Sequence, residues 1–123
     1  MPVKTLYDFK ISESLYKDLH SQATWRHHSL HEEIRTRLER TGDPAYGRNY
    51  PADLNTKIHN ASHRLYLNPD KKQLTFDFHI SSKTANVLTK INLPPEETSA
   101  DILNEQIVKR LAYTLIDPFY DKK

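Results

Sequence analysis

The segment from Tyr7 to Arg40 reads YDFKISESLYKDLHSQATWRHHSLHEEIRTRLER and carries the most regular pattern of the chain. Apolar residues at positions 7, 9 and 11 alternate with polar residues at 8 and 10, which predicts a short strand with one buried face. A strand this short needs a partner for its backbone hydrogen-bonding groups. The simplest partner is the same strand of a second chain, so we expect a homodimer built around a two-stranded ribbon.

Two helices should follow this strand. Ser12 is a favourable N-cap for the first helix. The apolar stripe of that helix recurs at four-residue spacing and comprises Leu15, Leu19 and Ala23. Ser29 opens the second helix with a capping box, in which its side-chain oxygen accepts from the amide of Glu32 while Glu32 reaches back to the amide of Ser29. The apolar face of the second helix comprises Leu30, Ile34 and Leu38.

The whole chain divides into three parts. Residues 1–41 form the ribbon and its two helices. Residues 42–62 contain both glycines and show no sustained periodicity, so we interpret them as a linker or an irregular wrap. Residues 63–123 predict a small α+β domain of order β-β-β-α, with strands near 65–67, 74–80 and 87–93 and a helix over 99–116. We recognise no internal repeat, and we expect an α+β fold.

Composition excludes several classes of protein. The 123 residues include 18 Lys and Arg against 16 Asp and Glu, which is not the strong positive excess of a nonspecific nucleic-acid coat. The chain has no cysteine, so it has no disulfides and no thiolate zinc sites. No apolar run is long enough to cross a bilayer, and no signal peptide is visible. We therefore expect a cytoplasmic protein without a cofactor or membrane contact.

The N-terminal part resembles the ribbon-helix-helix family, and most of all its Arc and Mnt branch of phage repressors. The resemblance lies in the order and spacing of three features: the alternating strand, Ser12-Glu13 at the start of one helix, and Ser29-Leu30-His31-Glu32-Glu33-Ile34 at the start of the next. It covers about a third of the chain. It implies an intertwined dimer that lays its ribbon in the major groove of DNA.

The same resemblance implies roles for individual residues. Bases would be read by the outward strand residues Leu6, Asp8 and Lys10, with Lys10 donating to guanine. Phosphates would be held near the start of the second helix by Ser29, Leu30 and His31, and by Lys4 before the strand. A buried polar network would join His28, Glu33 and Arg37, at the positions where the Arc branch has a charged triad. The implied function is that of a sequence-specific repressor, bound to a double-stranded operator as a homodimer or a tetramer and associated with the nucleoid of a bacterial or phage host.

Other interpretations remain open. The outward strand face could simply be an edge that carries Lys against aggregation. His27, His28 and His31 invite a metal hypothesis, but His27 precedes the cap of the helix that carries His31, so we expect no metal site. Catalysis is not expected, because Thr75, Asp77 and His79 are explained by a solvated sheet face. The chain could instead be an accessory protein of plasmid transfer or partition, or an antitoxin whose C-terminal part binds a toxin, or a module that binds another protein and never meets DNA.

Overall fold

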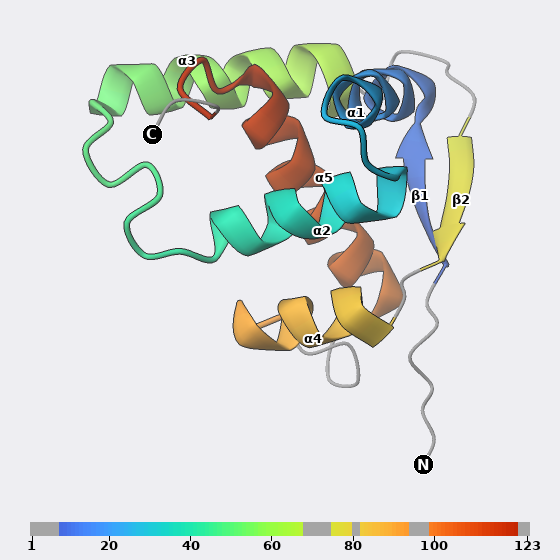
Figure 1. Ribbon diagram of the computed structural model, residues 1–123. Coiled ribbons are helices and arrows are strands. Elements are labelled where there is room, and N and C mark those ends of the chain that lie inside the picture. The colour runs from blue at the N-terminus through green and yellow to red at the C-terminus, as the bar shows by residue number, and fades with distance from the viewer. Residues whose placement is uncertain (1–7, 68–74, 80–81, 94–98, 121–123) are drawn as a thin grey trace.

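The computed structural model of the chain is mostly helical and describes residues 8–67, 75–79, 82–93 and 99–120. In chain order its elements are β1 (Asp8–Ser12), α1 (Glu13–Trp25), α2 (Leu30–Thr41), α3 (Ala52–Ser62), a π-helical turn (His63–Leu67), β2 (Thr75–His79), α4 (Ser82–Lys90) and α5 (Ala100–Ile116). Figure 1 shows the two strands at one side of the molecule and the helices on the other.

The two strands form an antiparallel ladder within one chain. Phe9 is the partner of Phe78, and Lys10 is the partner of Asp77. The predicted strand near residues 7–11 is therefore present, but its expected pairing with a second copy of the chain is wrong. The backbone groups of β1 find their partners in β2, which follows much later in the same sequence, so the ladder needs no intertwined dimer.

The predicted β-β-β-α domain is also wrong. The strand expected near 65–67 is a π-helical turn, the linker expected over 42–62 contains α3, and the strand expected over 87–93 lies mostly in α4. Val87 and Ile91 fit a spacing of two, but Thr84, Leu88 and Ile91 recur at helical spacing, and all of these side chains are buried. Burial against α2 selects the helical period over the period of two.

The expectation of no internal repeat fails as well. The pentapeptide Asp8-Phe9-Lys10-Ile11-Ser12 recurs as Asp77-Phe78-His79-Ile80-Ser81 and differs only at its third residue. Each copy leads into two helices, α1 and α2 after the first and α4 and α5 after the second. The chain therefore runs through the order strand-helix-helix twice.

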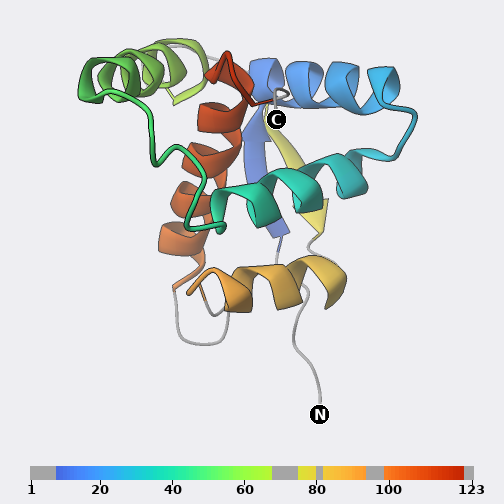
Figure 2. The same cartoon turned by 60° about the vertical axis from the view of Figure 1, so that its left-hand side comes forward.

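The register of the ladder relates the two copies by a local twofold axis. Phe9 and Phe78 are equivalent residues of the repeat and lie opposite each other, so residues equally far from this pair also face each other along the ladder. Figures 1 and 2 show the consequence, with α1 at one end of the ladder and α4 at the other. Between them α2 packs against α5.

Both copies of the repeat bury their side chains in a single core. The first copy contributes Ile11, Leu15, Leu19, Ile34 and Leu38, and the second contributes Leu88, Leu103, Ile107 and Leu111. Of the apolar stripes predicted for α1 and α2, four residues lie in this core, Leu30 packs against it half-buried, and Ala23 is buried as well. Since neither copy closes this core alone, we infer that the two halves fold as one cooperative unit.

The segment between the copies is tied to the C-terminal end of α5. Tyr46 donates a hydrogen bond to Oδ2 of Asp117 at 2.6 Å, and Tyr50 donates to the same oxygen at 2.8 Å. Burial, and after it the hydrogen bond to the carboxylate, raises the pKa of Tyr50 to about 12. From there α3 packs along α5 and leads back towards α1, where the Tyr66 hydroxyl donates to Asp18.

Candidate nucleic-acid interface

The outer face of the ladder is marked by Lys10. Its side chain is exposed, whereas that of the next residue, Ile11, is only 1% exposed and enters the core. This alternation fits a strand with one buried face. Of the other predicted base-reading residues, Asp8 begins β1 but its side chain lies outside the described part of the chain, as does the whole of Leu6. Lys4, a predicted phosphate contact, also lies outside the described residues.

The edge of β1 that does not pair with β2 is hydrogen-bonded by a side chain of α5. The backbone amide of Lys10 donates to Oδ1 of Asn104 at 2.6 Å, and Nδ2 of Asn104 donates back to the carbonyl of Lys10 at 3.3 Å. One amide side chain thus satisfies both backbone groups of this residue, as a neighbouring strand would. This contact fixes the strand at the position from which the Lys10 side chain leaves the ladder.

The N-terminus of α2 opens towards solvent beside α4. Ser29 caps it, since its side-chain oxygen accepts from the amide of Glu32 at 3.1 Å. The carboxylate of Glu32 pairs with Arg35 at 3.5 Å. A hollow of about 230 Å³ lies next to the cap and is lined by Ser29, His31, Glu32, Arg35, Lys83 and Thr84. Ser29 and His31 are exposed and Leu30 is half-buried.

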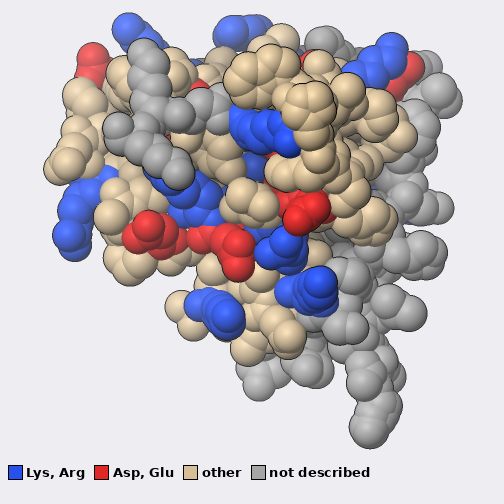
Figure 3. Space-filling model, viewed as in Figure 1, with Lys and Arg blue, Asp and Glu red and all other residues tan. Residues whose placement is uncertain are grey.

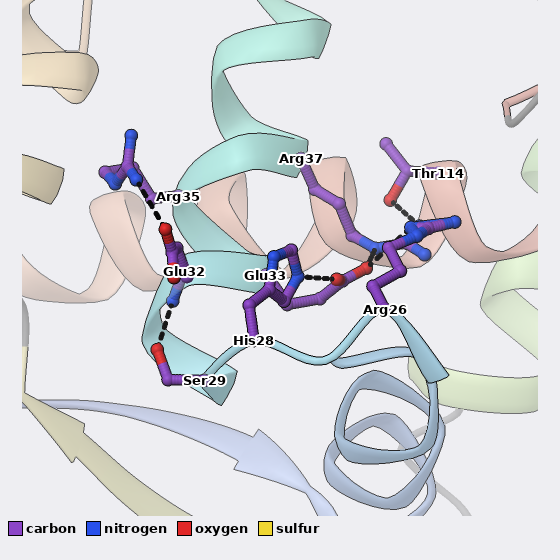
Figure 4. Close-up of polar contacts among 8 residues, drawn as sticks. All are labelled: Arg26, His28, Ser29, Glu32, Glu33, Arg35, Arg37 and Thr114. Atoms are coloured by element: carbon purple, nitrogen blue, oxygen red, sulfur yellow. Dashed lines mark hydrogen bonds and ion pairs between the residues drawn. The ribbon is translucent and has the colours of Figure 1, made fainter. Parts of the chain in front are cut away.

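A polar network lies behind this terminus, drawn in Figure 4. Nε of Arg37 donates to Oε2 of Glu33 at 2.7 Å, and Nε2 of His28 lies 2.5 Å from Oε1 of the same carboxylate. Glu33 and Arg37 are 1% and 2% exposed. The structure therefore brings the predicted trio of His28, Glu33 and Arg37 together. Arg26 adds a further ion pair to Glu33 at 3.4 Å.

The network connects the two copies of the repeat. Nη1 of Arg37 donates to the hydroxyl of Thr114 on α5 at 2.9 Å, and the guanidinium lies 4.4 Å from the ring centroid of Tyr120. Burial alone would raise the pKa of Glu33, but the hydrogen bonds from His28 and Arg37, together with the charges of Arg37 and Arg26, outweigh it. The pKa of Glu33 therefore lies below its ordinary value, and the carboxylate is charged at neutral pH.

Charge is distributed evenly over the described part of the face in Figure 3. Lys and Arg side chains there are interspersed with Asp and Glu and do not merge into one broad positive field.

Within the described ranges, no three His, Cys, Asp or Glu side chains group as metal ligands. His27 adopts a left-handed backbone conformation, with φ of 60°, in the turn between α1 and α2.

Three features of this surface are not among the predicted site residues. The partners of Lys10 and Asp8 in the ladder are Asp77 and His79, which are interpreted above as a plain solvated face. The sequence feature that indicates the role of Asp77 and His79 is the repeated pentapeptide, which is too short to be found by a search for long or periodic repeats. Asn104 and Lys83 reach the site from the second copy, and no local pattern marks them, because their role depends on how the copies pack.

Comparisons with family models, with curated proteins and with solved structures found no match to this chain. Across the described ranges, no helix is long and apolar enough to cross a membrane.

Proposed function

We propose that this chain binds double-stranded DNA in a sequence-specific manner and reads the major groove with the β1–β2 ladder. The observation that carries the proposal is the antiparallel β1–β2 ladder with the exposed Lys10 side chain pointing away from the core. A two-stranded ribbon has the dimensions to enter the major groove of B-DNA, and the ammonium group of Lys10 can donate to O6 and N7 of guanine.

The helices support this proposal by fixing the ladder. The edge of β1 is held by Asn104, and the network around Glu33 locks α2 against α5. A rigid ladder loses little conformational entropy on binding, which favours recognition. The N-terminus of α2, with Arg35 and Lys83 beside it, is suited to hold a phosphate that flanks the ribbon.

The resemblance of the N-terminal part to the ribbon-helix-helix family supports the same function. Here, however, a single chain supplies both strands, so a homodimer is not needed to make the ribbon. A transcriptional repressor of the Arc type, cytoplasmic and associated with the nucleoid, is the role we favour. An accessory protein of plasmid transfer or partition would use the same ladder and stays a second candidate.

The test is selection of bound duplexes from a random DNA library with the full chain, followed by anisotropy titration of the enriched sequence. Lys10→Ala should weaken binding to that sequence by roughly 1–3 kcal/mol and relax the preference at one base pair. Lys57→Ala is the matched control, because it removes the same charge from an exposed site on α3, outside the ladder. Failure to enrich any sequence, or equal losses in both variants, would count against the proposal.

A further inference from the structure

The two halves of the ladder are nearly but not fully equivalent. In the repeated pentapeptide, Lys10 of the first copy corresponds to His79 of the second, and the other residues are identical. The local twofold axis places these two residues at equivalent positions on opposite sides of the Phe9–Phe78 pair. A homodimer would instead present the same residue at both positions.

Lysine and histidine offer different groups to a base edge. The ammonium of Lys10 has three donors and no acceptor, whereas a neutral imidazole has one donor and one acceptor. Lys10 can therefore donate to O6 and N7 of one guanine at once, whereas a single imidazole N–H can reach only one acceptor. The two halves of the ladder therefore favour different sequences at equivalent distances from the centre of the site.

The flanking helices break the symmetry further. The connection between α1 and α2 is a tight turn over residues 26–29, and the connection between α4 and α5 runs over residues 91–99. In addition, Asn104 of α5 binds the edge of β1. The helices that flank the ladder are thus not connected alike on the two sides.

From these differences we infer that one chain occupies one duplex site and that this site lacks twofold symmetry. The inference rests on the proposed function and extends it to the class of DNA sequence that is bound.

The experiment uses the duplex enriched in the selection above, together with two palindromes made by duplicating each of its halves. The wild-type chain should bind the enriched, asymmetric duplex best, and the mass of the complex should correspond to one chain per duplex. His79→Lys makes the two pentapeptides identical and should shift preference towards one palindrome by roughly tenfold. Lys10→His makes them identical in the opposite sense and should shift preference towards the other palindrome.

The outcomes separate this inference from the function on which it rests. If no duplex is enriched, the DNA-binding function itself is wrong. If the enriched site is a palindrome, whether it holds one chain or two, or if both reciprocal variants keep the wild-type preference, DNA binding stands and the asymmetric site is wrong. Lys57→His on α3 serves as the control and should leave the order of the three duplexes unchanged.

Discussion

Phe9 and Phe78 lie opposite each other in the β1–β2 ladder, and each is the second residue of a nearly identical pentapeptide. This pairing makes the chain a folded unit with two strand-helix-helix halves. It also removes the reason for expecting a homodimer, since the unpaired backbone groups of β1 are satisfied within the chain.

The close approach of Ile91 to Gly42 should exclude any side chain at the C-cap of α2. A Cβ atom added at Gly42 would lie 1.9 Å from Cγ2 of Ile91, at the far end of α4. We expect Gly42→Ala to cost about 1–3 kcal/mol of unfolding free energy through overpacking. Urea unfolding of Gly42→Ala, Ile91→Ala and the double variant checks this. In the double variant the loss should be clearly smaller than the sum of the single losses, and additive losses would show that the two residues do not meet.

The network around Glu33 should make stability depend on pH. The pKa of Glu33 is lowered in the folded chain from a reference value of 4.5, so its contribution is complete above that pH and is lost as the pH falls through the lowered value. Glu33→Gln should cost about 3 kcal/mol or more at neutral pH, because Arg37 stays buried without its charged partner. The variant should lose less further stability on acidification than the wild type does.

Glu39→Gln is the matched control for that experiment. Glu39 lies on the same helix and pairs with Arg35 at 3.7 Å, but its side chain is exposed. Its substitution should cost about 0.5 kcal/mol or less. Thermal unfolding between pH 3 and pH 7 compares the two variants, and a Glu33→Gln profile that runs parallel to the wild-type profile would contradict the role given to this carboxylate.

The clamp that Asn104 places on β1 should control local opening of the ladder. Asn104→Ala removes two hydrogen bonds to the backbone of Lys10, each with a net contribution of about 0.5–1.5 kcal/mol. Amide hydrogen exchange at Lys10 should accelerate accordingly. Glu105→Ala, which removes only a surface pair to Lys109, should leave that amide protected. If Lys10 exchanges at the same rate in both variants, the clamp is not what holds the strand.

Local chemistry made part of the fold predictable. The predicted N-caps Ser12 and Ser29 accept backbone amides, as Ser99 also does, and the helices that follow them start where the sequence indicates. The network of His28, Glu33 and Arg37 is implied by the resemblance to the ribbon-helix-helix family, and its members lie within one helix and the turn before it. These features depend on residues close together in the chain, which is why the sequence reveals them.

The errors concern partners that are distant in the chain. The alternating pattern around Phe9 predicts a strand that needs a partner strand. It does not identify the segment around Phe78 as that partner. Val87 and Ile91 satisfy a strand period and a helix period at once, and only packing against α2 decides between them. Comparing the two short segments around Phe9 and Phe78 would have indicated both the pairing and the second set of helices.

The most direct test of the ladder within one chain uses two engineered cysteines, since the natural sequence has none. Lys10→Cys combined with Asp77→Cys places the thiols on residues that are partners in the ladder, at a separation that a disulfide can bridge. After mild oxidation, denaturing electrophoresis without reductant should show a single chain with no free thiol, and peptide mapping should show the two cysteines joined. A covalent dimer, or two thiols that stay free, would contradict the ladder and with it the single-chain DNA reader.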